Sequence, residues 1–362
     1  MNFNAIFLKS FRVLLLPFAL LYGLIIIIRN FLYDKKYLRS SEFNFPLICV
    51  GNLSVGGTGK SPMVEYLIQL LRPHFKIATV SRGYKRKTKG YVLAKDNSTA
   101  LEIGDEPMQF HINFPDIAVA VGEERIVAIP QLLHDKPDTQ AIILDDAFQH
   151  REVRACFNIV LTQYGDLFTN DFFLPTGDLR DQRSSYKRAD IIIITKCPAD
   201  MSDTEKIELI NEIEPLSHQK IFFTAIDYGV PYHISNHSFR KISNEDEVLL
   251  VCGIANPGPL KDYIFDNAAT YYQMDYSDHH IFRIDDLKDI RKKYEGITAD
   301  KKMIITTEKD AVRLIKFTEE LRDIPLYVLP IRHRFLFNAG SEFDEMVIHF
   351  IRNFKMKGEA VE

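Results

Sequence analysis

The sequence predicts an α/β fold with a mostly parallel sheet, a second and smaller α/β domain, and an N-terminal membrane helix. Three observations predict it: apolar runs that alternate with helical patterns, a glycine-rich loop between a strand and a helix, and a charge-free segment near the N-terminus. The chain has 362 residues, of which 46% are hydrophobic and 26% charged. That length and composition are typical of a folded protein with two domains, each with its own core.

Residues 13–28 carry no charge, and Arg12 and Arg29 flank them. As a helix this segment is about 24 Å long, against about 30 Å for the apolar core of a bilayer. A cleaved signal peptide does not fit, because no small-residue cleavage site precedes Arg29. A helix that is apolar on every face needs either core on all sides or lipid. We interpret residues 1–40 as a helix embedded in, or spanning, a membrane, and the basic residues after it predict a body that faces the cytoplasm.

Short apolar runs typical of covered parallel strands form two series, separated by a polar, turn-rich stretch at 228–244. We therefore expect a first domain at 41–235 and a smaller α/β domain at 236–362. The first series comprises residues 45–50, 76–80, 117–121, 141–144, 158–161 and 191–195, and the second comprises 248–252, 303–307 and 326–329.

The four cysteines are widely spaced, and each lies in or beside an apolar run. Because disulfide and zinc frameworks need closer groupings, we expect four reduced core thiols in a cytosolic body. These are Cys49, Cys156, Cys197 and Cys252.

The strongest motif is the glycine-rich loop GNLSVGGTGKS at residues 51–61. Its backbone amides can surround phosphates, Lys60 can reach the β- and γ-phosphates, and the Ser61 hydroxyl can bind Mg²⁺. The loop departs from the strict phosphate-loop pattern only at Ser54, where a glycine is usual. It predicts a P-loop NTPase-type sheet. The expected phosphate cradle is Ser54, Val55, Gly56, Gly57, Thr58, Gly59, Lys60 and Ser61.

Asp145 and Asp146 follow the apolar run 141–144, and so lie at the carboxyl edge of the sheet, where such folds bind ligands. We expect them to hold Mg²⁺ with Ser61. The run 191–195 is followed by Lys196, Cys197 and Pro198, so the aspartate that reads guanine in GTPases is absent. The nucleotide expected is therefore ATP.

Five segments together resemble the tetraacyldisaccharide 4′-kinase (lipid A 4′-kinase) family. They read VGNLSVGGTGKSP, SRGYKRKTKG, GDEP, LDDAFQHR and TTEKDAVR, in this order along most of the chain. The resemblance implies an ATP-dependent kinase that phosphorylates the 4′-hydroxyl of a tetraacyldisaccharide 1-phosphate, a lipid A precursor, at the inner face of the inner membrane. Ser61 replaces the family's commoner threonine and Ala147 a glycine; neither change removes a functional group.

The resemblance also implies site residues. Asp105 matches the family's catalytic aspartate, and its partner histidine falls in the segment Asp278-His279-His280. His279 is preferred, and His280 remains the alternative. Arg180 and Asp181 are expected at the phosphate and metal site, with Asp181 as a metal ligand. Arg125 is a weaker candidate, and residues 306–310 are expected to be a strand end and helix cap whose role at the nucleotide is open.

Five basic residues crowd eight positions after residue 81: Arg82, Lys85, Arg86, Lys87 and Lys89. Beside a membrane helix, such a loop favours contact with lipid headgroups or a phosphorylated lipid, and a solvated turn is the alternative. Nucleic acid is not expected, because it needs a wider basic surface and stacking aromatics. No protein partner is evident. A membrane-docked switch that only binds nucleotide is the competing function.

Overall fold

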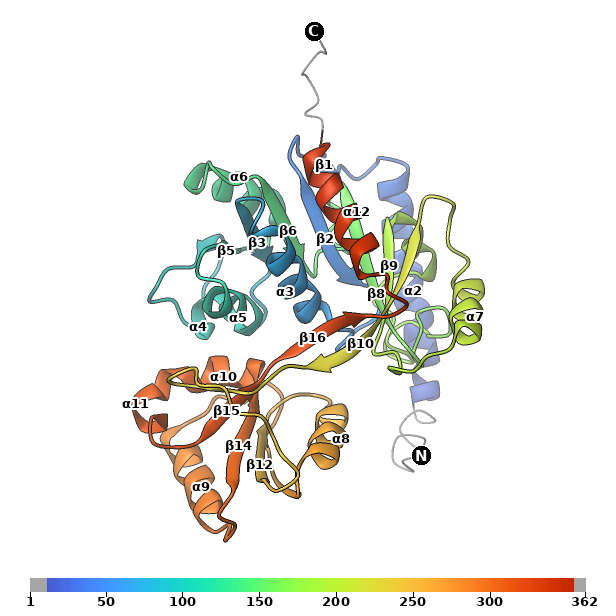
Figure 1. Cartoon of the computed structure of the whole chain (residues 1–362). Coiled ribbons are helices and arrows are strands. Elements are labelled where there is room, and N and C mark those ends of the chain that lie inside the picture. The colour runs from blue at the N-terminus through green and yellow to red at the C-terminus, as the bar shows by residue number, and fades with distance from the viewer. Residues whose placement is uncertain (1–11, 355–362) are drawn as a thin grey trace.

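The computed structural model describes residues 12–354, so the first eleven residues of the expected 1–40 segment lie outside this description. It contains a nine-stranded sheet of order β16-β10-β9-β8-β2-β6-β3-β5-β4 and a five-stranded sheet of order β11-β15-β14-β12-β13 (Figure 1). A parallel ribbon of β1 (Ser41–Glu42) and β7 (Val153–Arg154) lies outside both. The α/β fold with two sheets, predicted from the alternation of apolar runs, is confirmed.

In the large sheet only the edge strands β4 and β16 run antiparallel to their neighbours. Its strands are β2 (Leu47–Asn52), β3 (Ile77–Ser81), β4 (Val92–Leu93), β5 (Ala118–Val121), β6 (Ala141–Asp145), β8 (Phe157–Gln163), β9 (Ile191–Thr195), β10 (Lys220–Tyr228) and β16 (Ile331–Phe335). The central strands are buried along their whole length, because helices cover both faces.

One face of the large sheet packs against α3 (Lys60–Leu71), α5 (Asp105–Asn113) and α12 (Gly340–Arg352). The other face packs against α6 (Arg125–Asp135) and α7 (Asp203–Ile213). The short α4 (Ala100–Ile103) precedes α5, and the 3₁₀ turn η2 (Arg183–Arg188) precedes β9.

The smaller sheet consists of β11 (Tyr232–His233), β12 (Glu247–Cys252), β13 (Thr270–Asp275), β14 (Lys302–Thr307) and β15 (Leu326–Leu329). One face is covered by α9 (Ile284–Glu295), α10 (Glu308–Leu314), η3 (Ile315–Phe317) and α11 (Thr318–Leu321). The other face is covered by α8 (Gly258–Asn267).

The C-terminal segment differs from the expected division. The chain leaves the large sheet through β10 and returns through β16, which pairs antiparallel with β10 from Thr224↔Phe335 to Tyr228↔Ile331. After β16, α12 buries Phe343 against the large sheet. The expected 236–362 domain is therefore too long, because residues 331–352 belong with the first sheet. The mixed polar sequence IRHRF of this half-exposed edge strand gave no strand signal.

Cys49, Cys197 and Cys252 are buried free thiols, as expected. The expectation that Cys156 lies in the core is wrong. This residue is exposed, because it lies just before β8, where the chain is still at the surface.

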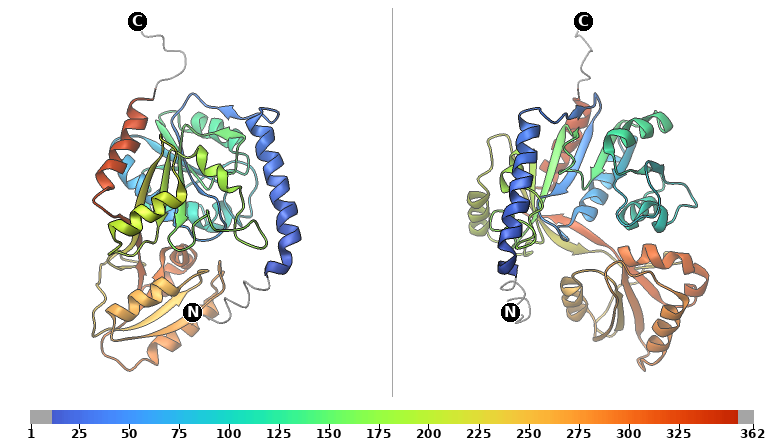
Figure 2. Two further views of the ribbon diagram at one scale, coloured as in Figure 1. Left: turned by 90° about the vertical axis from the view of Figure 1, so that its right-hand side faces the viewer. Right: turned by 180° about the vertical axis from the view of Figure 1, so that it is seen from behind.

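The N-terminal helix consists of η1 (Val13–Leu15) and α2 (Leu16–Asp34) and lies along one side of the large domain (Figure 2). It is 22 residues long and contains an 18-residue window with a mean hydropathy of 2.1, so by length and composition it is able to cross a membrane. A narrow stripe faces the protein: a Cβ at Gly23 would come within 2.5 Å of the Phe173 ring. Most of its large apolar side chains are exposed, including Phe18, Leu20, Leu24 and Ile28.

Three charged residues from three elements meet where the two domains join. Arg332 of β16 has its Nη1 3.1 Å from Glu65 Oε2 of α3 and 3.1 Å from Glu308 Oε2 of α10. Both carboxylates are buried. Burial and the neighbouring Glu308 raise the pKa of Glu65 to about 7. Arg332 is thus the cation that compensates two buried acids.

We expect Arg332→Met to lower the free energy of unfolding by about 3–5 kcal/mol at pH 8, because it leaves two buried carboxylates facing each other. These acids bind protons more tightly in the folded state than in the unfolded state. The stability of the variant should therefore rise as the pH falls from 8 towards 5.5, more steeply than that of the wild type. Urea unfolding at both pH values measures this. Arg334→Met, on an exposed position of the same strand, is the control; equal behaviour of the two variants would contradict the prediction.

Candidate active site

The phosphate loop joins β2 to α3 and is held from behind by buried polar side chains. Gly59 closes it at φ 88°, a conformation that favours glycine. Thr195 Oγ1 donates to Thr58 O at 2.9 Å, and His333 Nε2 donates to Gly59 O at 2.9 Å. Burial lowers the pKa of His333 to about 4, so this ring is neutral and its Nδ1 accepts from Thr224 Oγ1. The loop is therefore fixed by strands of the sheet itself.

Asp146 lies next to Lys60 and Arg180. Arg180 donates to both of its carboxylate oxygens, and Lys60 Nζ lies 3.6 Å from Oδ1. Burial opposes the ionisation of Asp146, but these two cations outweigh it and hold the pKa well below its usual range. Asp146 also has a φ of 50°, which is unusual for a residue other than glycine and is typical of functional positions.

Asp145 ends β6 and is almost fully buried. Ser81 Oγ donates to its Oδ2 at 3.3 Å. Burial, together with Asp146 and Glu106, raises the pKa of Asp145 to about 7. A bound cation would stabilise the negative charge of such a buried carboxylate.

The oxygen donors Ser61, Asp145 and Asp146 are chemically suited to Mg²⁺. Within residues 12–354, no group of three or more His, Cys, Asp or Glu residues is arranged to hold a metal ion. A Mg²⁺ ion here would therefore complete its coordination with nucleotide phosphates and water, which is its usual mode of binding.

The structure does not bring Asp181 to this position, so its prediction as a metal ligand is wrong. Its carboxylate accepts from Asn30 Nδ2 at 2.7 Å, Gln182 N at 2.8 Å, Ser185 Oγ at 3.0 Å and Arg188 Nη2 at 3.1 Å. These donors occupy both oxygens. Asp181 instead attaches α2 to the large domain through Asn30. The motif that contains Arg180 and Asp181 did not indicate this role.

Asp105, the first residue of α5, meets His279 although the two are 174 positions apart. His279 Nδ1 lies 2.7 Å from Asp105 Oδ2. The backbone of His279 has a φ of 62°. Burial opposes the ionisation of Asp105, but hydrogen bonds from His279 and Arg313 outweigh it and lower the pKa of the carboxyl. His280 Nε2 instead lies 3.0 Å from Asp286, so of the two histidines only His279 contacts Asp105.

The segment 306–310 is a strand end and helix cap as expected, since Thr307 Oγ1 accepts from Asp310 N at 3.1 Å. Sequence reasoning missed two basic contacts that α10 makes. Lys309 Nζ lies 2.9 Å from Glu106 Oε1, and Arg313 Nη2 lies 2.8 Å from Asp105 Oδ2. The basic residues at positions 4 and 8 of TTEKDAVR were the available signal.

Two basic residues that were expected to contact lipid or phosphate, Arg86 and Arg125, make other contacts instead. The Arg86 side chain is 2% exposed and lies 2.7 Å from Glu123, so it stabilises its own loop. Arg125 is buried behind the acid pair, where it donates to the backbone carbonyls of Gly122 and Asp145. The remaining basic side chains of the loop, Arg82, Lys85, Lys87 and Lys89, are exposed.

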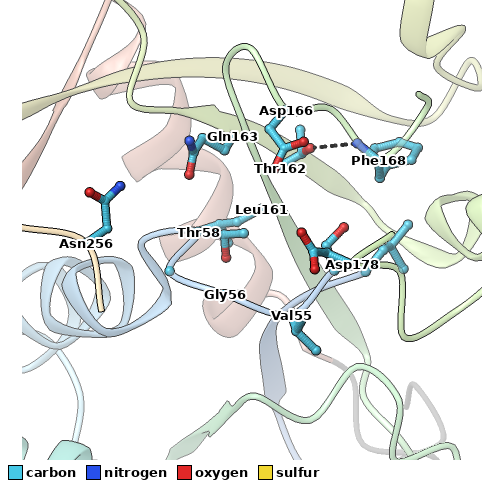
Figure 3. A pocket seen from close by; sticks show the side chains of 13 residues that line it. Val55, Gly56, Thr58, Leu161, Thr162, Gln163, Asp166, Phe168, Asp178 and Asn256 are labelled. Atoms are coloured by element: carbon cyan, nitrogen blue, oxygen red, sulfur yellow. Dashed lines mark hydrogen bonds between the residues drawn. The ribbon is translucent and has the colours of Figure 1, made fainter. Parts of the chain in front are cut away.

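A cavity of about 230 Å³ adjoins the phosphate loop (Figure 3). Residues 53–58 line one side, the end of β8 with Gln163 lines another, and Asn256 reaches it from the smaller domain. Since β8 and β6 flank β2 on opposite sides, the strand that carries this cavity and the strand that carries the acid pair lie on either side of the phosphate loop.

Comparison with known proteins agrees with this geometry. The profile of the family described as tetraacyldisaccharide-1-P 4′-kinase matches residues 11–352. Tetraacyldisaccharide 4′-kinase of Flavobacterium johnsoniae is 46% identical over 343 residues, which cover 94% of this chain and 97% of that protein. That of Bacteroides thetaiotaomicron is 40% identical, covering 93% of each chain.

Among solved structures, LpxK from Aquifex aeolicus in complex with ATP has a TM-score of 0.72 and 27% sequence identity. The match covers 94% of this chain and 99% of that one. The chain therefore belongs to the tetraacyldisaccharide-1-P 4′-kinase family.

Proposed function

We propose that this protein transfers the γ-phosphate of ATP to the 4′-hydroxyl of a tetraacyldisaccharide 1-phosphate in lipid A biosynthesis. The observation that carries the proposal is the contact of Asp105 with His279 beside a phosphate loop. A protein that only binds nucleotide and signals to a partner needs the loop but not this pair.

ATP would bind with its phosphates on the amides of residues 54–61 and its nucleoside towards the cavity at the end of β8. This direction places the γ-phosphate at the acid pair, on the side of β6. Lys60 and Arg180 then supply positive charge where negative charge develops during transfer. Ser61, Asp145 and Asp146 would hold Mg²⁺, which neutralises charge on the β- and γ-phosphates when bound.

Asp105 would accept the proton of the acceptor hydroxyl as the sugar oxygen bonds to phosphorus and ADP departs. His279 would hold the Asp105 carboxylate. Because His279 comes from the smaller domain, the pair forms only where the two domains meet, and an acceptor bound at Asp105 would be enclosed between them. Enclosure excludes water, and so limits hydrolysis of ATP.

The function is tested with purified protein, γ-labelled ATP and an acylated glucosamine disaccharide 1-phosphate. We expect label to move to the lipid, and ATP turnover to depend on it. Lys60→Ala should reduce transfer by at least about 10²-fold while the protein stays folded, because the developing charge loses its main cation. Circular dichroism checks the fold. Acceptor-independent hydrolysis by the wild type, or full activity of folded Lys60→Ala, would refute the assignment.

Asp105→Ala and His279→Ala should each lower kcat by about 10²–10⁴-fold, the usual contribution of general-base catalysis. The KM for ATP should change little, because neither residue belongs to the phosphate cradle. His280→Ala is the matched control, since this neighbouring ring contacts Asp286. Damage from His280→Ala with a harmless His279→Ala would show that the wrong histidine has been chosen.

We also propose that α2 attaches the enzyme to the inner membrane, with its body on the cytoplasmic side and the exposed basic loop near lipid headgroups. The exposed apolar face of α2 and the basic residues after it support this. Attachment keeps the site at the surface where the lipid acceptor is concentrated.

Replacing Leu20, Leu24 and Ile28 together by glutamine should release the protein from membranes washed in about 1 M salt, where charge attraction is screened. These residues are 65%, 53% and 49% exposed, so the fold should survive. The apparent KM for lipid in vesicles should rise, with kcat in detergent unchanged. Ile207→Gln, at an exposed position of α7, is the control. Sedimentation like that of the wild type would contradict the attachment.

A further inference from the structure

Three N–H groups converge on one oxygen of Asp105. Oδ2 accepts from His279 Nδ1 at 2.7 Å, from Arg313 Nη2 at 2.8 Å and from Arg313 Nε at 3.1 Å. Among residues 12–354, no hydrogen bond reaches the other oxygen, Oδ1. The carboxylate is thus bound on one side and open on the other.

Arg313 is itself rigidly placed. Its side chain is 6% exposed, and its Nη1 lies 3.2 Å from Asp310 Oδ1. Asp310 is fully buried, and its Oδ2 accepts from Gly253 N at 3.0 Å and Thr307 Oγ1 at 2.7 Å. The guanidinium is therefore held by Asp310, which is itself fixed in the core of the smaller domain by Gly253 and by Thr307, the N-cap residue of α10.

We propose that Arg313 is a positioning residue for phosphoryl transfer, which holds Asp105 so that its open oxygen Oδ1 faces the acceptor hydroxyl. The proposal rests on the kinase function proposed above. Arg313 adds two donors to the oxygen that His279 contacts, and so opposes rotation of the carboxylate about its Cβ–Cγ bond. His279 alone, with one donor to the same oxygen, leaves that rotation open.

Arg313 also acts through its charge. The charged or titratable groups around Asp105 are Glu106 on its own helix, His279 and Asp278 after β13, Tyr84 after β3, and Lys309, Asp310 and Arg313 on α10. Of the cations, Lys309 is paired with Glu106 and Arg313 contacts Asp105 directly. Glu102 of α4 bonds to its own cap at Thr99. Removing Arg313 should therefore raise the pKa of Asp105, since its charged form loses its closest fixed cation.

A simple brace between the domains is the competing role. The two domains are also joined by Lys309 with Glu106 and by Arg332 with Glu308, neither of which touches Asp105. A brace would stabilise the docking of the two domains whichever residue occupies position 105. A positioning residue acts only while the Asp105 carboxylate is present.

The test uses full-length protein, γ-labelled ATP and the lipid acceptor, with kcat, KM and the pH profile measured for each variant. Arg313→Gln, which keeps a donor but loses the charge, should lower kcat by about 10–100-fold and leave the KM for ATP within about threefold. The acidic limb of its profile should move to higher pH, because Asp105 must be ionised to accept the proton. Arg313→Lys should restore most of kcat and the position of the limb. Arg322→Ala, an exposed arginine paired with Glu319, is the control.

The double variant decides between the two roles. In Asp105→Ala protein, Arg313→Gln should add almost no loss, because the residue it positions is gone. An equal fold-loss in both backgrounds, or an unmoved acidic limb, would overturn the proposal in favour of a brace. If the wild type itself transfers no label to lipid, the kinase function has failed, and this is visible before any Arg313 variant is compared.

Discussion

The pairing of β10 with β16 is the constraint on which the arrangement of the two domains depends. One strand carries the chain out of the large sheet and the other brings it back, in a fixed antiparallel register. The register places His333 against the phosphate loop and Arg332 between two buried carboxylates. Because neighbouring side chains of one strand point to opposite faces, a single element contacts both the nucleotide site and the junction of the domains.

This connection explains how residues far apart in the chain form one site. The phosphate loop and acid pair belong to the large sheet, whereas His279 and Arg313 belong to the smaller domain. Both sets are charged, and the buried charges are nearly all compensated within the protein. Asp145 is an exception, since no ion pair or cationic hydrogen bond to its carboxylate is found among residues 12–354. That places the least compensated carboxylate where Mg²⁺ and phosphate are expected to meet.

The sequence predicted most of the strands, because fully covered parallel strands are apolar on both faces and lack the ambiguity of half-exposed ones. It predicted the phosphate loop and the acid pair from their spacing and chemistry. Asp105 and His279 could be paired only through family resemblance, since no local pattern joins residues 174 positions apart. Asp181 was misplaced because its neighbour Arg180 does contact the acid pair, and successive side chains need not share a site.

The same two neighbours, Arg180 and Asp181, connect the N-terminal helix α2 to the acid pair. Arg180 sends its side chain to Asp146, while its backbone oxygen accepts from Tyr22 of α2 at 3.0 Å. Asp181 accepts from Asn30, further along the same helix. The acid pair is therefore held at a fixed place relative to α2 by adjacent residues of one loop in the large domain. Asp105 is held instead by Arg313 and His279 of the smaller domain. The position of the acid pair relative to α2 and the position of the Asp105 carboxylate are thus set by separate contacts, and only the second set joins the two domains.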